Sequence, residues 1–551
     1  MTAEAHPPTP PETPPADYAW SLPGGLIEKP GHAPELGELW CYTDEFSYAP
    51  GAEVPIRVHT TASAFDIRVV RDGAIPQTVY EASGVPGTQQ STPANAYEAG
   101  CGWTESLRIV LDSGWQPGFY LIVVGAEHRG RRLESEGFFI VRAEDAASYD
   151  FALIHATSTM LAYNDWGGAN HYRGLPDGHL DDIPSPVVSS RRPIARGMLR
   201  KPAEAPRNAH ADAPPPDWEP RYPPYEWAWH RRYSRHHADA GWASYERPFT
   251  VWAEGQGYRV AHLTQTDLQL RPEALDGFSA AVIVGHDEYW SWEMRDTIDA
   301  FVDRGGSLAR FGGNYVWQVR LDDTGTQQTC YKDASQDPML DHDVTRVTTM
   351  WDWDRIGRPG AQTMGLSGIQ GSYIRYGNAV PRASGGFTVY RPDHWVFAGT
   401  ALEYGDVFGA APFCIAAFEV DGVDYTFRRG LPYPTFADGA PETLEILALT
   451  PAVAGQRDRW GGRVPIGAPI VEAVGLIDAL YDGAPPAHLR DQEYGSAMIA
   501  TFTRGRGRVL TAGTTEWVNG LILGDAFTAA ITKNVLDEFC TAAKGNDHAD
   551  H

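Results

Sequence analysis

The chain is poor in cysteine, and this shortage limits the classes to which it can belong. Its 551 residues include five cysteines, which are Cys41, Cys101, Cys330, Cys414 and Cys540. They are widely spaced and no two form a CxxC pair, so neither a zinc knuckle nor a disulfide scaffold is indicated. The pattern fits a reducing compartment, and we expect a cytoplasmic protein.

Long apolar runs are also missing. No stretch approaches the roughly 20 residues that a membrane-spanning helix requires. The segment from Met1 to Ala19 is rich in proline and acidic residues, without the basic and apolar parts of a secretory signal. We predict that residues 1–34 form a disordered tail and that the protein has no membrane partner.

Positive charge is scarce overall. The formal net charge is −26 and the isoelectric point is about 5.0, which disfavours binding to the phosphate backbone of nucleic acid. Residues 191–235 are the exception, because ten arginines or lysines stand there against five acids. We interpret this segment as a solvated basic loop that pairs with the acidic remainder of the chain.

The motifs of several large enzyme classes are absent as well. The sequence has no Gly-x-Ser-x-Gly elbow of serine hydrolases and no Gly-x-x-x-x-Gly-Lys-Ser/Thr loop of nucleotide hydrolases. The function must therefore be inferred from the order of the predicted strands and helices and from a few polar turns.

The length of the chain predicts more than one domain. Residues 35–145 contain short alternating strands separated by turn residues, which predicts an immunoglobulin-like β-sandwich accessory domain. Residues 146–551 alternate between strands and helices, which predicts an α/β domain, with a long excursion at 176–240 and an inserted antiparallel layer from about 322 to 480.

The most informative stretch runs from Ala280 to Trp290. The apolar run Ala-Ala-Val-Ile-Val has no alternation, as expected for a strand covered on both faces. Helical spacing follows from Trp292 to Asp303, then a Gly-Gly stop, then a second strand from Ser307. This order predicts a βαβ crossover whose first turn lies at the carboxyl end of a parallel strand, where α/β proteins bind ligands.

That first turn contains His286, Asp287, Glu288 and Tyr289. An imidazole and a carboxylate two residues apart in extended backbone can face one crevice, which suits one metal ligand and one acid/base group. The alternative is that Asp287 or Glu288 caps the helix that begins near Ser291.

A second polar turn, Tyr163-Asn164-Asp165-Trp166-Gly167-Gly168, follows the predicted strand from Phe151 to Ile154. The phenolate of Tyr163 would be a hard anionic ligand for a ferric ion. The alternative is an ordinary amphipathic tyrosine with a hydrogen-bonded tip.

These two turns resemble a known family. Ala162-Tyr163-Asn164-x-Trp166-Gly167-Gly168 and Gly285-His286-Asp287-Glu288-Tyr289-Trp290, followed by Gly312-Gly313-Asn314, are similar to segments of the large subunit of N,N-dimethylformamidase. The resemblance covers roughly residues 150–540. It implies a glutamine-amidotransferase-like α/β core behind a β-sandwich, although no cysteine stands at the nucleophile turn that glutamine amidotransferases use.

The resemblance also implies a mononuclear iron held by two tyrosines and one glutamate. Tyr163 matches the first tyrosyl ligand, Glu288 matches the carboxylate ligand, and His286 matches a neighbouring histidine. The second tyrosine is not identified, because Ile194 and Phe249 stand where an Arg-Pro-Tyr segment is expected. The tyrosines that remain as substitutes are Tyr172, Tyr222, Tyr225 and Tyr233.

The family segment that brings a further glutamate to the site resembles residues 417–422, so Glu419 is a candidate general base. The alternative for Glu419 is an edge-strand carboxylate of no special role. Glu516 also ends a predicted strand, and there we favour helix capping over a place in the crevice.

The leading hypothesis is therefore a metal-assisted amidohydrolase that cleaves the non-peptide C–N bond of a small amide, with His286 and Glu419 as catalytic residues and Tyr163 and Glu288 as iron ligands. The second hypothesis is a non-catalytic binding or assembly module with an incomplete metal site. Carbohydrate processing, which rests on the 18 tryptophans and the paired acids, is a third. We expect a homo-oligomer, with a small partner subunit as a further expectation.

Overall fold

The computed structural model describes residues 28–31, 37–175, 183–209, 223–373, 386–452, 477–489 and 494–545. Most of the predicted disordered tail and parts of the predicted excursion lie outside these residues. Within them, no helix has the length and apolar character needed to cross a membrane. The five cysteines are buried.

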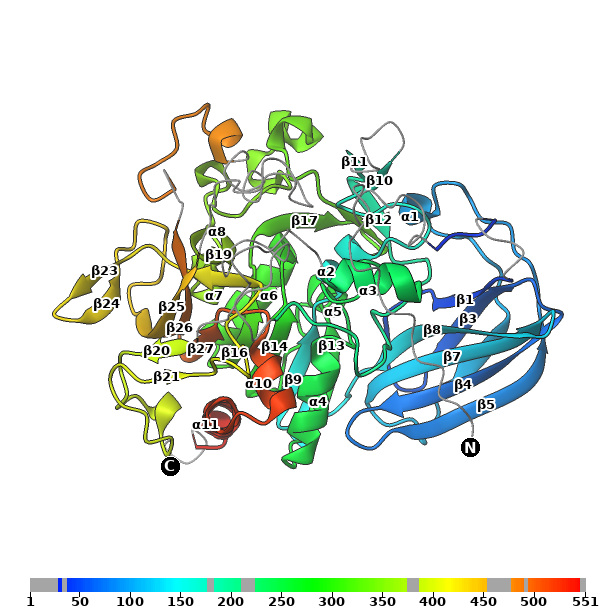
Figure 1. Ribbon diagram of the computed structural model, residues 1–551, viewed down its shortest axis with the longest axis horizontal. Helices are drawn as coiled ribbons and strands as arrows, with labels where there is room; N and C mark the ends of the chain where they lie inside the picture. The colour runs from blue at the N-terminus through cyan, green and yellow to red at the C-terminus, as the bar shows by residue number, and fades with distance from the viewer. Residues whose placement is uncertain are drawn as a thin grey trace.

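Two sheets form the N-terminal part of the molecule, at the right of Figure 1, and their strands pair antiparallel except for the parallel pair of β2 with β8. Their inward side chains alternate along the strands, as Phe65, Ile67 and Val69 do in β4, and pack into one buried core. The strand order is β1-β3-β6 in one sheet and β2-β8-β7-β4-β5 in the other. The strands are β1 (Leu39–Thr43), β2 (Ser47–Tyr48), β3 (Glu53–Thr60), β4 (Ala64–Asp72), β5 (Gln77–Pro86), β6 (Leu107–Val110), β7 (Gly118–His128) and β8 (Arg131–Val141), with the short helix α1 (Ala96–Ala99) between β5 and β6.

A nine-stranded sheet forms the centre of the rest of the described chain, in the order β13-β9-β14-β16-β27-β26-β25-β20-β21. The first five strands are parallel and the last four are antiparallel. They are β9 (Phe151–His155), β13 (Val260–Thr264), β14 (Ala280–His286), β16 (Ser307–Gly313), β20 (Phe387–Val389), β21 (Val407–Phe408), β25 (Glu445–Ala452), β26 (Gly495–Arg504) and β27 (Gly507–Ala512).

Helices cover both faces of this sheet, which explains why its central strands are apolar without alternation. Val282 and Val284 of β14 pack with α4, α10 and α11, whereas Ala281 and Ile283 pack with α2, α5 and α6. The helices are α2 (Thr157–Tyr163), α3 (Pro223–Arg231), α4 (Glu246–Gly255), α5 (Gln265–Leu270), α6 (Trp292–Asp303), α7 (Ala361–Met364), α8 (Gly368–Gly371), α10 (Trp517–Leu523) and α11 (Ala526–Gly545).

The βαβ crossover predicted from the sequence is confirmed. Strands β14 and β16 pair in parallel, and α6 joins them with the predicted bounds. Ser291 caps α6, since its hydroxyl accepts a hydrogen bond from the backbone N–H of Met294. The turn after α6 passes through Gly305 at φ +112°, a left-handed conformation that glycine adopts without a steric penalty.

The inserted antiparallel layer is only partly as predicted. Strands β20, β21 and β25 do not form a separate layer, because they extend the central sheet. The remaining strands outside the N-terminal sheets pair in small sheets. One contains β12 (Val187–Ser189), β15 (Tyr289–Ser291), β17 (Trp317–Leu321) and β18 (Gln327–Thr329). Two more pair β19 (Ser372–Tyr373) with β22 (Glu419–Gly422) and β23 (Tyr425–Arg428) with β24 (Leu431–Pro434). Strands β10 (Gly174–Leu175) and β11 (Ile183–Pro184) form one further pair. The low periodicity of these short strands hides which sheet each one joins.

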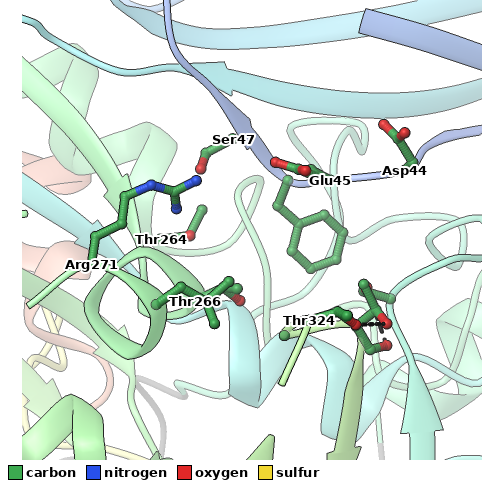
Figure 2. A pocket seen from close by; sticks show the side chains of 12 residues that line it. Asp44, Glu45, Ser47, Thr264, Thr266, Arg271 and Thr324 are labelled. Atoms are coloured by element: carbon green, nitrogen blue, oxygen red, sulfur yellow. Dashed lines mark hydrogen bonds between the residues drawn. The ribbon is translucent and has the colours of Figure 1, made fainter. Parts of the chain in front are cut away.

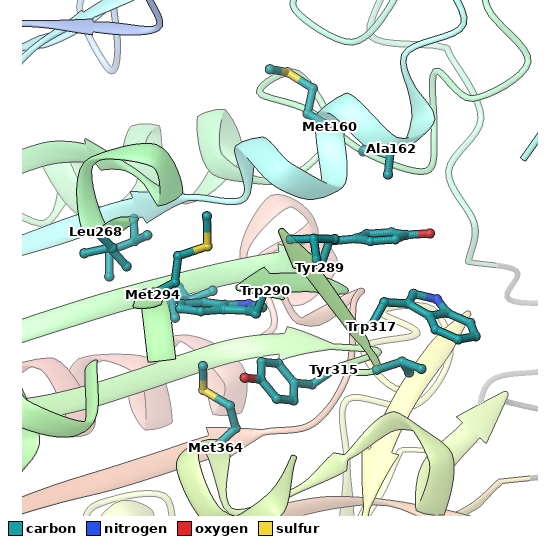
Figure 3. Close-up of a cluster of buried hydrophobic side chains, with 14 of the residues drawn as sticks. Met160, Ala162, Leu268, Tyr289, Trp290, Met294, Tyr315, Trp317 and Met364 are labelled. Atoms are coloured by element: carbon teal, nitrogen blue, oxygen red, sulfur yellow. The ribbon is translucent and has the colours of Figure 1, made fainter. Parts of the chain in front are cut away.

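A cluster of aromatic and sulfur-containing side chains packs between α2, α6 and the loops after β14 and β16 (Figure 3). The rings of Trp290 and Tyr315 lie 5.9 Å apart, and Met294 and Met364 pack beside them. Tyr289 and Trp317 lie at the edge of this cluster in neighbouring strands, because β15 and β17 pair in parallel with these residues in register. Burial of these large side chains fixes the polar turn between β14 and α6.

The sandwich is packed directly against the α/β part. The ring of Phe119 in β7 stacks on that of Trp242 at 3.9 Å, and Trp242 donates its indole N–H to the carboxylate of Asp72 at 2.8 Å. A small polar cavity of about 70 Å³ lies at another point of this boundary, between Glu45 and Ser47 of the sandwich and Thr266 and Arg271 of the α/β part (Figure 2). Its hydroxyl and charged groups are bound to one another, as in the contact of Ser47 with Asp267 at 2.6 Å.

Glu246 makes the stability of the protein depend on pH. Complete burial raises the pKa of its carboxyl group from 4.5 to about 7, and Oε2 has no hydrogen-bond partner. Because the folded state holds the proton more tightly than the unfolded chain, stability falls as pH rises from about 4.5 to about 7. We expect Glu246→Gln to be more stable than the wild type by about 2 kcal/mol at pH 8 and equal to it at pH 4.5. Urea unfolding at both pH values measures this difference, and an equal difference at the two values contradicts it.

Candidate active site

Several polar side chains meet at the carboxyl edge of the parallel strands. The chain runs from β9 to β13 on one side and then returns to β14 on the other, so the carboxyl ends of β9 and β14 form a topological switch point. Tyr163 follows β9 through α2, whereas His286 is the last residue of β14. Asn314 follows β16, and Glu419 is the first residue of β22.

Tyr163, Tyr172 and Glu288 form a cluster of oxygen atoms, which we call the phenol–carboxylate cluster. The hydroxyl of Tyr163 donates to Oε2 of Glu288 at 3.0 Å. The hydroxyl of Tyr172 lies 2.8 Å from that of Tyr163 and 2.9 and 3.0 Å from the two oxygens of Glu288. The two predicted ligands therefore lie together, and Tyr172 is the tyrosine that joins them.

Three further side chains surround this cluster. The hydroxyl of Tyr289 donates to that of Tyr172 at 2.7 Å, and the indole N–H of Trp317 donates to Oε1 of Glu288 at 2.7 Å. The ammonium group of Lys332 lies 3.5 Å from the centroid of the Tyr172 ring, a cation–π contact. The hydrogen-bond donors of Tyr289 and Trp317 and the positive charge of Lys332 thus lie around the phenol–carboxylate cluster.

His286 and Glu419 form a second group beside the cluster. Nε2 of His286 lies 2.8 Å from Oε2 of Glu419 and 3.3 Å from Oε2 of Glu288. The side-chain amide of Asn314 donates to the same oxygen of Glu419 at 2.9 Å. Nδ1 of His286 donates to the backbone carbonyl of Asp239 at 2.7 Å, which directs Nε2 toward the two carboxylates.

The backbone at this point is shaped by Gly285. It adopts φ +80°, and a Cβ added there would lie 2.2 Å from the ring of Tyr245. Only glycine fits this position, and the resulting turn aims His286 at Glu419.

Burial and mutual charge shift the pKa values within the site. Burial disfavours a charged imidazole, but the carboxylates of Glu419 and Glu288 raise the pKa of His286 to about 9. Burial raises the pKa of Glu288 to about 7, with Glu419 adding to the effect and His286 opposing it. Burial, together with the Glu288 and Glu419 carboxylates, raises the pKa of the Tyr163 phenol well above its ordinary value. The Tyr163 phenol keeps its proton here unless a positive charge enters the cluster.

A buried ion triad joins the two segments that carry the carboxylates. Nε of Arg310 in β16 lies 2.8 Å from Asp287, and Nη1 lies 2.5 Å from Asp421. All three side chains are fully buried. Asp287 therefore does not cap α6, and neither does Glu288, so the capping alternative for this turn is wrong.

Capping is also the wrong role for Glu516, which makes no side-chain hydrogen bond to α10. Its carboxylate instead accepts hydrogen bonds from Arg207 at 2.8 Å and from the hydroxyl of Tyr245 at 3.1 Å. These contacts lie behind Gly285, on the side of the turn away from the phenol–carboxylate cluster.

The other substitutes for the second tyrosine lie elsewhere. The ring of Tyr225 packs 6.1 Å from that of His236, and Tyr233 packs on Trp227. Tyr222 lies outside the described residues. Ile194 and Phe249, which stand in the Arg-Pro segments, are buried core residues.

Sequence reasoning assigned no role to Asn314, Asp239, Trp317 or Lys332, and it left Tyr172 unselected among four tyrosines. Asn314 had a detectable signal, because it follows Gly312-Gly313 at a strand end and adopts φ +63°, which asparagine tolerates better than most residues. Asp239 contacts His286 through its backbone carbonyl, so the type of its side chain could not indicate this contact.

Comparison with known families finds a family whose model matches most of the chain. The model of the N,N-dimethylformamidase beta subunit-like, C-terminal family matches residues 67–529. The chain belongs to this family. The match reaches well into the β-sandwich, beyond the start of the resemblance noted from the sequence. No curated protein matches the chain.

Proposed function

We propose that this N,N-dimethylformamidase-like protein is an amidohydrolase that cleaves the C–N bond of a small, non-peptide amide with the help of a metal ion. The single observation that carries the proposal is the convergence of two phenols and a carboxylate within 3.0 Å of one another, beside a histidine paired with a second carboxylate.

The donor set fits a hard, highly charged cation. Tyr163, Tyr172 and Glu288 offer only oxygen ligands, which suit such a cation. Among the described residues, no three histidine, cysteine, aspartate or glutamate side chains are arranged to hold a metal ion. The site that we propose therefore uses the two phenol oxygens together with Glu288, and the ion that we propose is mononuclear iron. The ion, when bound, supplies a Lewis acid that polarises the amide carbonyl.

The proton steps are assigned to the second group of side chains. Glu419, which His286 and Asn314 hold in place, takes a proton from the water that attacks the amide carbon. The C–N bond then breaks, and the same proton passes to the departing nitrogen. The products are a carboxylic acid and an amine. His286, whose pKa is raised, keeps its proton at neutral pH and fixes the orientation of Glu419.

Tyr172→Phe tests the proposal most directly, because it removes one ligand oxygen and leaves the ring under Lys332 in place. We expect the iron content per chain to fall at least 10-fold, which matches the usual effect of losing ligand-shell groups. Hydrolysis of N,N-dimethylformamide and formamide, followed by amine release, should fall with it. Elemental analysis of purified protein measures the iron.

Tyr233→Phe is the matched control, because that phenol lies outside the cluster. It should retain wild-type iron and activity. Equal iron content in the wild type and Tyr172→Phe would overturn the assignment of the ligands. Wild-type protein that contains iron but hydrolyses neither amide would overturn the proposed substrates.

The non-catalytic alternative was motivated by the lack of a phenol at positions 194 and 249. Tyr172 supplies a phenol from a different part of the chain, so that motivation no longer holds. The family description names a beta subunit, and we propose that this chain also assembles with further subunits, which light scattering of the purified protein tests.

A further inference from the structure

Arg235 is a buried cation without an acidic partner among the described residues. Its side chain is 7% exposed. Nε donates to Nε2 of His236 at 3.2 Å, and the guanidinium lies 5.2 Å from the centroid of the Tyr225 ring. No carboxylate in the part of the chain that the structure describes forms an ion pair with it. Arg192 and Arg295 are also buried without a carboxylate partner among the described residues, but their guanidinium groups donate to backbone carbonyls. Arg235 has no such carbonyl partner among the described residues, which leaves most of its N–H donors available to bind an anion.

His236 places this guanidinium next to the phenol–carboxylate cluster. The His236 ring lies 5.2 Å from the ring of Tyr163 and 6.0 Å from that of Tyr172. Its Nδ1 donates to the carboxylate of Asp239 at 2.8 Å, and its Nε2 accepts from Arg235. One imidazole thus separates Arg235 from the proposed iron ligands, and Asp239 holds both His236 and, through its backbone, His286.

Two acidic side chains, Asp239 and Asp165, interact with His236. Asp239 is bound to His236 and to the amide of Asn208 at 3.0 Å. Asp165 is buried, and its charge acts on Arg192 and His236, but it makes no ion pair with Arg235. Its two oxygens accept no hydrogen bond, so Asp165 is the one competing group that could favour a cationic ligand instead.

Arg235 is also the last cation of the basic segment at residues 191–235, the only such segment in a chain of net charge −26. Other cations of this segment already have carboxylate partners: Arg200 binds Glu134 and Glu136, and Arg207 binds Glu516. Arg235 differs from them, because no carboxylate pairs with it among the described residues.

We infer that Arg235 forms a carboxylate-binding subsite and that the natural substrate is a small amide that carries a carboxylate group. This inference rests on the proposed amidohydrolase function. The guanidinium binds the carboxylate with two parallel N–H donors, and the amide end of the same molecule reaches the phenol–carboxylate cluster.

Matched amides test the inference on the purified holoenzyme. Succinamate, butyramide and 3-aminopropanamide have similar size and carry a negative, neutral and positive end, and N-formylglycine and N-ethylformamide form a second pair. We expect kcat/KM to be at least 10-fold higher for succinamate than for butyramide, and for N-formylglycine than for N-ethylformamide. Equal values for the charged and neutral members, or a preference for the cationic amide, would overturn the inference, the latter in favour of Asp165.

Arg235→Met should remove the preference by raising KM for the carboxylated amides about 100-fold, with kcat and the kinetics of the neutral amides little changed. Arg235→Lys keeps the charge without the paired donors and should restore part of the preference, which preserves the test if the methionine variant does not fold. Arg191→Met, an exposed arginine of the same segment, is the control and should behave as the wild type.

Calorimetric binding of succinamate separates this inference from the proposed function. If the wild type hydrolyses no amide, the proposed function fails, and binding to the wild type that is lost in Arg235→Met still supports the carboxylate subsite. Equal binding of succinamate to the two proteins overturns it.

Discussion

Glu419→Gln is expected to lower kcat for amide hydrolysis by about 10²–10⁴-fold, the usual contribution of a positioned general base. Glutamine keeps the size of the side chain and an acceptor for Asn314, so the fold and the phenol–carboxylate cluster should persist. Iron content should stay at the wild-type level, because Glu419 lies beyond the proposed ligands. Steady-state kinetics together with elemental analysis measure both quantities.

The same substitution has a spectroscopic consequence. The carboxylate of Glu419 is the main group that raises the pKa of His286, to about 9. Without it, the pKa of the imidazole should fall, which nuclear magnetic resonance of the histidine ring detects. Glu442→Gln, at an exposed carboxylate, is the control. Unchanged kcat in Glu419→Gln would exclude this residue as the base.

Arg310→Met is expected to destabilise the protein by about 3–5 kcal/mol, because it leaves two buried carboxylates without a cation. It should also abolish hydrolysis, since Asp287 precedes Glu288 and Asp421 lies on the same strand as Glu419. The free energy of unfolding by urea and the amide kinetics measure these effects.

The control for this variant is Arg304→Met, in which an exposed arginine loses an exposed partner. We expect a change below about 1 kcal/mol there. Arg310→Lys keeps the charge but loses the forked geometry of the guanidinium, so its free energy of unfolding should lie between those of the wild type and Arg310→Met. Wild-type stability in Arg310→Met would show that the triad is not needed to hold the two segments together.

The sequence predicted the parallel part of the fold well. Strand β14, helix α6 and strand β16 have strong local signals, namely an unbroken apolar run, a helical period and a Gly-Gly stop, and each appears with nearly the predicted bounds. The assignment of β20, β21 and β25 to a separate layer was wrong. Strands β20 and β21, of three and two residues, have no period from which their neighbours can be predicted. Strand β25 is longer, but its residues do not indicate that it pairs with β26 in the central sheet.

The sequence could predict which side chains come together only for residues that lie soon after the end of a strand. Tyr163, His286 and Glu288 do so, and the structure places all three within contact of one another. Tyr172 could not be selected, because its position depends on how the loop after α2 folds back. Arg310 had no signal either, since an arginine inside an apolar strand gives no indication of the two aspartates that surround it.

The stacking of Phe119 on Trp242 has a consequence for how the molecule can be divided. Trp242 also stacks on His155 at the end of β9, and β9 leads directly to the helix that carries Tyr163. Removal of the sandwich would therefore expose the indole of Trp242 and the end of β9 to water. We expect the two parts of the chain to unfold in one cooperative transition, so a protein cut at the predicted boundary near residue 146 should lose the order of β9.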